Sequence, residues 1–261
     1  MSAGFATAVQ VEWLKQRRGV GPWLVVIGAL FTPAVVTAVR LLHRAGLPAL
    51  YASATFWPDL WTSCWESMAI FFLPFAAILI CSLVTQVEVR NNAWKQVHAL
   101  PLATGTIFCA KYALAALMLG AFILLFALGV LFAGFVPAFL VPGVPIPRVP
   151  PPMTDFLGDS VGYYIDVLPI VAVQYLLSLR FGNFLVAIGV GFLGWVTALA
   201  TLSWQLGYVV PYIYGMSAYL AHRPGVKALA MPIDGHVLAL AYFAAFTVIA
   251  YVSFVLRDDK G

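Results

Sequence analysis

The chain has 261 residues, of which 63% are hydrophobic and only 9% are charged. Soluble globular domains carry roughly 25% charged residues. A soluble fold of this size could not bury so much apolar surface, so the composition predicts an integral membrane protein. The net charge of +4 indicates a bias in membrane topology, not nucleic-acid binding.

The N-terminal stretch, residues 5–18, is expected to form an amphipathic helix that lies on the inner membrane face. Trp13 shares one side of this stretch with other apolar residues, whereas Glu12, Lys15 and Arg18 lie elsewhere. Helices of this kind bind at the membrane interface. The alternative is a frayed, basic N-terminus that only sets the topology. A signal peptide is not favoured, because the apolar run starts late and is long.

Six apolar runs follow, each of a length that suits a membrane span. A hydrocarbon core of about 30 Å needs roughly 20 helical residues. The runs are continuous and lack the strict alternation of a β-barrel, which favours helices. The predicted fold class is therefore an all-α integral membrane protein with a single transmembrane domain over residues 1–261. The expected spans are 23–42, 65–83, 107–135, 163–179, 184–202 and 237–256.

The distribution of charge predicts the orientation. If both termini are inside, nine Lys and Arg residues fall on the inner side and five on the outer side. This bias favours cytoplasmic termini under the positive-inside rule. Six of the ten acidic residues fall on the outer side, in agreement with this orientation: Asp59, Glu66, Asp155, Asp159, Asp166 and Asp234.

The outer loops are rich in proline and aromatic residues. Residues 137–152 hold seven prolines and are expected to form a stiff, extended connector without helix. The loop 203–236 is aromatic, and Trp57, Trp61 and Trp65 add to the same outer belt. Aromatic residues at this depth usually anchor a protein to lipid headgroups. Contact with a substrate is the alternative.

The spans offer little chemistry of their own. Glu66, Lys111 and Asp166 lie near the ends of the predicted spans, whereas an ion-coupled transporter needs ionisable groups at the midplane. Gln174 is the most polar residue in the middle of a span, and a hydrogen bond between helices is its expected role. The sequence contains no H-E-x-x-H and no phosphate-binding loop. We therefore expect no catalytic residue, no metal site and no nucleotide bound by this chain.

A polar island, residues 88–101, separates the second and third spans. Residues 91–99 can form about two helical turns that project Arg90, Trp94 and Lys95. A short helix of this kind suits insertion into a groove on a cytoplasmic partner, and Trp and Arg are enriched at interface hot spots. The alternative is an ordinary positive loop with its tryptophan at the headgroups.

Two motifs carry a resemblance to a known family: Glu88-x-x-x-Asn92-x-Trp94-Lys95 followed by Leu100-Pro101, and Glu12-x-x-Lys15-x-x-Arg18. The first resembles the segment between the second and third spans of type-2 ABC exporter permeases, most closely the lantibiotic-immunity branch. The second resembles the amphipathic elbow helix of that family. The span count and the length agree with the same architecture.

The resemblance implies a two-protein machine in the inner membrane of a bacterium. Two permease subunits, identical or paralogous, would dock on cytoplasmic ABC ATPase subunits. ATP and Mg²⁺ would bind the ATPase, and this chain would carry no cofactor. By the same resemblance, the coupling contact would involve Glu88, Arg90, Asn91, Asn92, Trp94, Lys95, Leu100 and Pro101.

An amphipathic substrate is expected, such as an antimicrobial peptide, a drug or a lipid. A charged hydrophilic cargo would find nothing at mid-depth to replace its water shell. Asp59, Glu66 and Gln174 are the candidate substrate contacts, although the two acids could equally be solvated loop residues. The rival functions are an ion-coupled secondary transporter and a non-transport membrane scaffold.

Overall fold

The structure, a computed structural model, describes residues 2–90, 103–181, 183–223, 225–226 and 229–258. Throughout these residues the regular elements are helices. In chain order they are α1 (Ser2–Gln16), α2 (Val20–Leu42), α3 (Leu47–Ala52), α4 (Phe56–Ser67), the π-helix η1 (Met68–Phe72), α5 (Leu73–Arg90), α7 (Thr104–Leu140), α8 (Met153–Arg180), α9 (Phe184–Thr201), the 3₁₀-helix η2 (Gly207–Val209), α10 (Tyr214–Ala221) and α11 (Gly235–Asp258).

The expected number of membrane-spanning helices is confirmed. Among the described residues, six helical units are long and apolar enough to cross a bilayer: α2, the continuous α4–η1–α5 unit, α7, α8, α9 and α11. The second unit starts at Phe56 rather than at residue 65, and α8 starts at Met153 rather than at residue 163. Hydropathy detects only the continuous apolar part of a helix. The first turns of the two units carry Asp59 in one and Asp155 and Asp159 in the other, so the predicted spans began too late.

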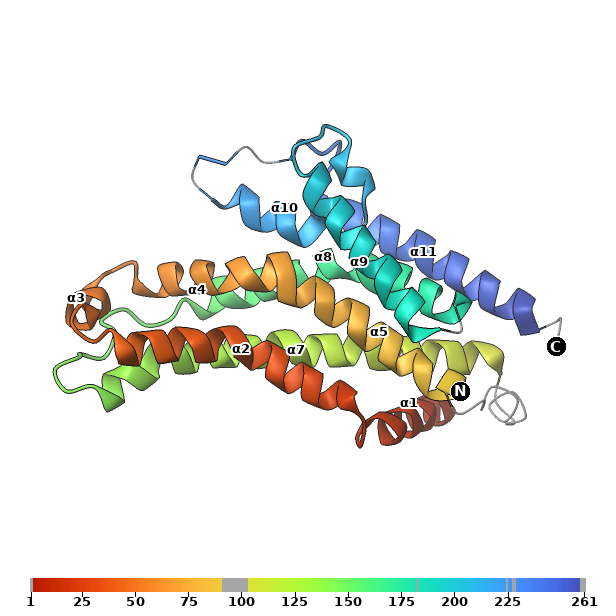
Figure 1. Ribbon diagram of the computed structural model, residues 1–261, viewed down its shortest axis with the longest axis horizontal. Helices are drawn as coiled ribbons and strands as arrows, with labels where there is room; N and C mark the ends of the chain where they lie inside the picture. Colours follow the sequence, from red (N-terminus) through yellow and green to blue (C-terminus); the bar gives the residue numbers. More distant parts are fainter. Residues whose placement is uncertain (1, 91–102, 182, 224, 227–228, 259–261) are drawn as a thin grey trace.

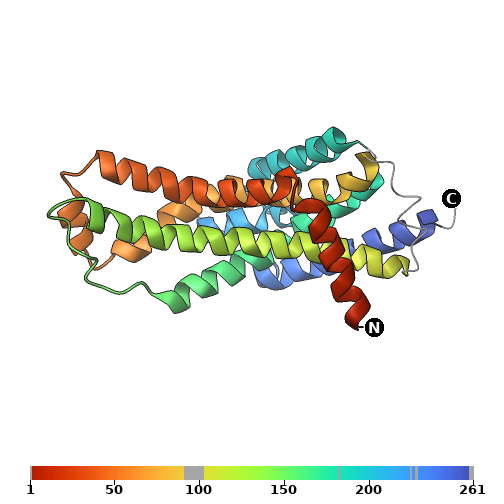
Figure 2. The same ribbon diagram turned by 90° about the horizontal axis from the view of Figure 1, so that it is seen from below.

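The helices form an elongated bundle. In Figure 1, α2, α4, α7 and α8 run along the long axis, while α9 and α11 lie above its right-hand half. The connector with α3 lies at the left end, and both termini lie at the right end. Figure 2 shows α1 crossing α7 obliquely near that right end. An even number of spans returns the chain to the side from which it started, in agreement with this arrangement.

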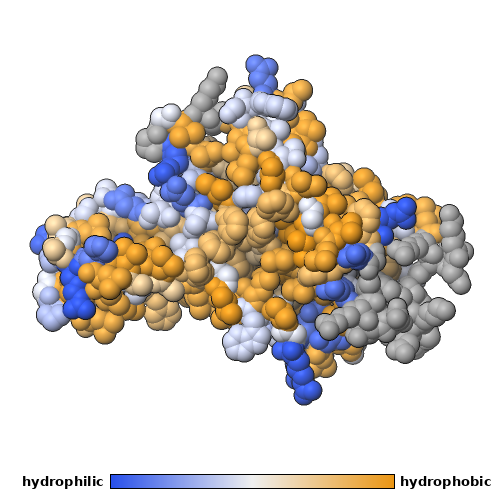
Figure 3. Space-filling view, viewed as in Figure 1, coloured by the Kyte–Doolittle hydropathy of each residue, from blue (hydrophilic) through white to orange (hydrophobic). Residues whose placement is uncertain are grey.

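Burial divides the spans into an inner and an outer set. In their most apolar stretches the α4–α5 unit, α7 and α8 are half or more buried, whereas α2, α9 and α11 are less than a quarter buried. Apolar side chains cover most of the face in Figure 3, and hydrophilic ones lie around its margins. The outer helices therefore present apolar surface that suits lipid or another membrane subunit.

Two prolines inside helices are accommodated by side chains from neighbouring helices. Pro74 cannot donate to the carbonyl of Ile70 four residues earlier, and the indole Nε1 of Trp195 in α9 donates to that carbonyl at 2.7 Å. Ile70 lies in the π-helix η1, so the irregular turn occurs at the same position as the hydrogen bond from another helix. Such replacement of lost backbone bonds is what allows proline inside a membrane helix.

The second proline corrects an expectation about the Pro-rich connector. Pro137 lies inside α7, which continues to Leu140, so the first residues of 137–152 are helical. The carbonyl of Ala133, which Pro137 leaves without its usual donor, accepts a hydrogen bond from Arg40 at 3.4 Å. Residues 141–152 contain no helix, as expected.

The tryptophans of α4 correct a second expectation. Trp57, Trp61 and Trp65 are 1–4% exposed, so the prediction that they anchor the protein to lipid headgroups is wrong. They follow one another at intervals of four residues and share one helix face. That face packs against α7 and α8, with Trp61 stacked on Phe156 at a ring-centroid distance of 4.0 Å. Trp204, in contrast, is 64% exposed.

Candidate functional site

The predicted coupling segment lies largely outside the described residues. The structure describes the chain up to Arg90, the last residue of α5, and again from Ala103, which precedes α7. Glu88 and Arg90 belong to the last turn of α5. The other predicted coupling residues lie outside the described residues: Asn91, Asn92, Trp94, Lys95, Leu100 and Pro101.

The helix α1 is attached to both helices that flank this segment. The carboxylate of Glu12 accepts from Lys111 Nζ of α7 at 2.5 Å, and the Lys111 side chain is 1% exposed. The same carboxylate contacts Lys15 Nζ at 2.6 Å. One residue along, Gln16 Nε2 donates to the carbonyl of Leu83 in α5 at 3.1 Å. One short helix therefore bridges α5 and α7 near the point where the polar island joins them.

The buried face of α1 is polar and its exposed face is largely apolar. Ala8, Glu12 and Gln16 are buried at intervals of four residues, whereas Trp13 and Leu14 are 42% and 50% exposed. Buried charges are retained only when they are paired, and the Glu12–Lys111 contact meets that need. Placement of α1 at the membrane interface stays a prediction that this apolar outer face supports.

Gln174 forms the centre of a buried polar seam, which we define as Ser82, Gln174, Ser178 and Tyr212. Gln174 Nε2 donates to Ser82 Oγ at 3.0 Å and to the carbonyl of Ala187 at 2.9 Å. The Tyr212 hydroxyl donates to Gln174 Oε1 at 3.3 Å. The predicted role of Gln174 in hydrogen bonding between helices is confirmed, because these bonds join α5, α8 and α9.

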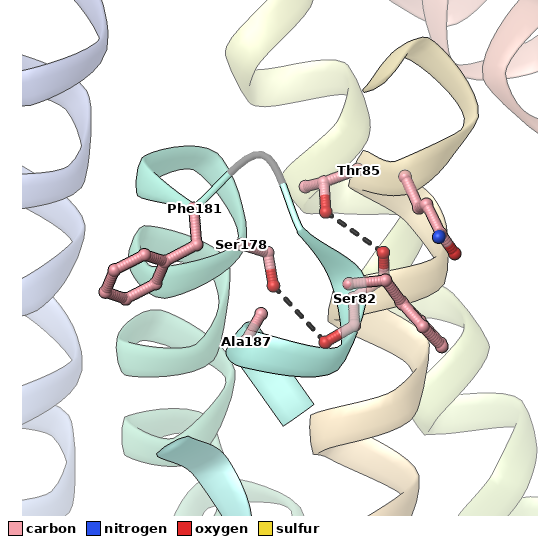
Figure 4. Close-up of a pocket in the computed structure, with 7 residues that line it drawn as sticks. Ser82, Thr85, Ser178, Phe181 and Ala187 are labelled. Carbon is pink, nitrogen blue, oxygen red and sulfur yellow. Dashed lines mark hydrogen bonds between the residues drawn. The ribbon is translucent and has the colours of Figure 1, made fainter. Parts of the chain in front are cut away.

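A small cavity adjoins the polar seam. Figure 4 shows its lining, with Ser178 directed towards Ser82 and Thr85 bonded to the carbonyl of Ser82. Its volume of about 10 Å³ is enough for about one water molecule. The cavity is too small to receive an amphipathic substrate.

The acidic residues predicted to face outwards lie in different surroundings. Asp59, in the first turn of α4, is exposed. Glu66 contacts Arg223 at 3.3 Å, and about half of each side chain is exposed, so this ion pair contributes little stability. Asp59 and Glu66 are therefore accessible, unlike Gln174, which is fully buried.

Asp166 lies in a different place from the one expected. Because α8 begins at Met153, Asp166 is near the middle of that helix rather than near its end, and it is 2% exposed. One carboxylate oxygen contacts His236 Nδ1 at 2.8 Å. His236 lies in the first turn of α11 and is followed by apolar residues, so the pair joins α8 and α11 at the level where α11 begins. Sequence reasoning missed this pair because the two residues are 70 positions apart.

Within the described residues, no cluster of three or more His, Cys, Asp or Glu side chains could hold a metal ion.

Comparison with known proteins identifies the family of this chain. The chain matches the family described as ABC-2 family transporter protein over residues 8–198, and no individual curated protein matches it. The matched region runs from α1 through most of α9. Members of this family are typically non-catalytic membrane subunits of ABC transporters. The chain therefore belongs to the ABC-2 family of transporter membrane proteins.

Proposed function

We propose that this chain is the permease subunit of an ATP-driven exporter in the bacterial inner membrane. It docks a separate cytoplasmic ATPase through residues 88–101 and pairs with a second permease subunit, identical or paralogous. It exports an amphipathic substrate such as an antimicrobial peptide, a drug or a lipid. The family and the six spans support the permease role.

The observation that carries this proposal is the bridge that α1 forms between α5 and α7. The Glu12–Lys111 ion pair fixes α1 to α7, and the Gln16–Leu83 hydrogen bond fixes it to α5. A force applied to the polar island would reach both helices together with α1. Closure of an attached ATPase could then favour one arrangement of the spans over another, which is what coupling between two sites requires.

The apolar character of the outer helices supports an amphipathic substrate. The exposed side chains of α2 and α9 include Ile27 at 61%, Phe31 at 52%, Leu185 at 74% and Leu193 at 62%. A lipid-like molecule could reach the protein along such surfaces directly from the bilayer. A soluble, highly charged molecule would lose its hydration there without compensation.

The docking assignment can be tested with Trp94→Ala in the chain co-expressed with its ATPase. Truncation of a buried aromatic anchor commonly costs more than about 2 kcal/mol of binding free energy, so the ATPase should no longer co-purify or should hydrolyse ATP without transport. Trp204→Ala is the matched control, because Trp204 is exposed and lies in the loop between α9 and α10. Normal co-purification and transport by Trp94→Ala would disprove the assignment.

The Asp166–His236 pair favours one second candidate, an ion-coupled carrier. A buried carboxylate beside a histidine could bind and release a proton. Reconstituted vesicles separate the two functions. Transport that depends on the ATPase and on ATP, and that survives collapse of the proton gradient, supports the exporter. Transport without an ATPase that stops when the gradient collapses supports the carrier.

A further inference from the structure

A second cavity lies between α4, α8 and α10, with a volume of about 60 Å³. The residues that form most of its lining are aromatic or acidic: Trp61, Trp65, Asp159, Tyr163 and Tyr219. The start of the second span, the start of the fourth and the connection between the fifth and sixth lie on the same side of a six-span protein. The cavity is therefore on the side opposite the termini.

The aromatic side chains of this cavity form a rigid frame. Trp65 stacks on Tyr163 at a centroid distance of 3.9 Å, and Trp61 meets Trp65 edge-on at 5.7 Å. Trp61 Nε1 donates to Asp159 Oδ2 at 2.8 Å, which fixes both the ring and the carboxylate. Arg223 already lies over the ring of Tyr219 at 5.6 Å, so a cation is attracted to this aromatic group.

One buried polar atom in the lining has no hydrogen-bond partner among the described residues, the indole Nε1 of Trp65, a residue that is 1% exposed. The Tyr219 hydroxyl, in contrast, has the Glu66 carboxylate as a hydrogen-bonding neighbour. Leaving a buried polar group unsatisfied costs roughly 1–3 kcal/mol. An indole N–H is a donor, so the guest must carry an acceptor oxygen, which the oxygen beside the ammonium group of a headgroup supplies.

The charge around the cavity favours a cation. Glu66 and Arg223 contact each other at 3.3 Å and largely cancel, so the carboxylate of Asp159 leaves the lining negative. Burial raises the pKa of the Tyr219 phenol, and the Glu66 carboxylate adds to that rise. His222 also lines the cavity, and its ring Nδ1 contacts the carbonyl of Ala218 at 2.8 Å. Aromatic rings beside a carboxylate are the usual recognition site for alkylammonium groups.

We propose that this cavity binds a small organic ammonium group. Two sources share this chemistry, the headgroup of a zwitterionic lipid and the head of a cationic amphiphile. The cavity volume corresponds to roughly four to six water-sized spheres, which suits a headgroup rather than a whole amphiphile. The site extends the proposed function, because it assigns a class of substrate to the outer side of the exporter. Only this role in transport rests on the proposed function; the binding of an ammonium group does not.

Binding of choline to the purified chain in a neutral detergent tests the site without an ATPase. Choline should change tryptophan fluorescence saturably, because Trp61 and Trp65 line the cavity. Its neutral isostere 3,3-dimethylbutan-1-ol should bind about tenfold more weakly or worse, since it lacks the charge that the rings and the carboxylate attract. This comparison uses the unaltered protein and so does not depend on the folding of a variant.

Asp159→Asn should weaken choline binding by about tenfold, while the asparagine can still accept from Trp61. Asp155→Asn is the matched control, because Asp155 is an exposed acid of the same helix that lies one turn away. Its choline affinity should equal that of the unaltered chain. Equal affinities for all three proteins, equal binding of the neutral isostere, or no saturable response would overturn the proposal and leave a cavity that holds water only.

Nanodiscs distinguish the two sources of the ammonium group. If a lipid headgroup occupies the site, the response to free choline should vanish in phosphatidylcholine nanodiscs and persist in phosphatidylglycerol nanodiscs. If the site receives a cationic amphiphile, choline should bind in both. Either result supports the proposal. Failure of ATP-driven transport with intact choline binding would instead disprove the exporter function alone.

Discussion

At the level of single residues, the contact between Glu12 and Lys111 joins two charges that are almost completely removed from solvent. Breaking a buried ion pair by removing one partner typically costs about 3–5 kcal/mol, because the remaining charge stays buried. Lys111→Met should therefore lower the thermal stability of the detergent-solubilised protein by up to this amount, since among the described residues Glu12 keeps only its contact with the more exposed Lys15. The measurement is the unfolding temperature, followed by circular dichroism.

Lys15→Met provides the matched comparison. Lys15 contacts the same carboxylate at 2.6 Å, but its side chain is 28% exposed, so solvent screens the pair and the cost should stay below about 1 kcal/mol. Equal losses for the two variants would show that burial does not determine the strength of this contact. A loss of ATPase coupling in Lys111→Met at temperatures where the protein stays folded would link the ion pair to the proposed function.

The two buried polar contacts differ in how far the sequence predicts them. Gln174 is the most polar residue in the middle of an apolar run, and its role in joining helices could be predicted because an amide in lipid needs a partner. Lys111 also stands out in the sequence, as a charged residue in an apolar run, but its partner Glu12 is 99 residues away. Nothing in the local pattern says which helix lies against which, so the pairing emerges only from the packing.

At the level of elements, the bond from Trp195 to the carbonyl of Ile70 compensates for Pro74. Trp195→Phe keeps an aromatic ring and removes the N–H donor. The carbonyl would then lose this donor, and we expect a loss of about 1–2 kcal/mol. Hydrogen exchange of backbone amides in η1 and the start of α5 should rise. Trp204→Phe, on an exposed ring, should leave both stability and exchange unchanged; the same exchange in both variants would contradict this role for Trp195.

Two glycines of α7 give a second comparison at the level of elements. A methyl group at Gly134 would overlap the ring of Trp57, which cannot move freely because its Nε1 donates to Val149 at 2.8 Å. Gly134→Ala should cost about 1–3 kcal/mol through overpacking. Gly120→Ala places its methyl group 3.8 Å from Tyr164, an ordinary contact, and should be neutral or stabilise the helix by up to about 1 kcal/mol. Thermal unfolding of the two variants decides; equal stabilities would show that α4 and α7 are not closely packed.

The extents of the helices show what hydropathy can and cannot predict. The six spans follow from apolar runs, because each run needs a helix to satisfy its backbone in lipid. The start of α4 at Phe56 does not follow, since its first turns carry a proline and the acid Asp59. The burial of Trp57 and Trp61 is also not apparent from the sequence, because interfacial and buried tryptophans have the same local pattern and only the packing of α7 and α8 separates them.

At the level of the whole molecule, the outer helices leave much apolar surface exposed. In α11, Val237, Val248 and Leu256 are 55%, 62% and 58% exposed, and α2 and α9 are similarly open. Lipid alone can cover such surfaces, because there is no hydrophobic drive for helices to associate inside a bilayer. The exposed faces are therefore compatible with a second permease subunit without indicating which face it would use.

Orientation is the property of the whole molecule on which the proposed function depends most. Nine inner against five outer basic residues predict cytoplasmic termini. Ile146 and Phe181 are 58% and 38% exposed and lie in connections on opposite sides of the membrane. In a Cys109→Ala background, which removes the exposed cysteine, Ile146→Cys should react with an impermeant maleimide in intact cells. Phe181→Cys should react only after permeabilisation. The reverse pattern would place residues 88–101 outside the cell, where no cytoplasmic ATPase could reach them.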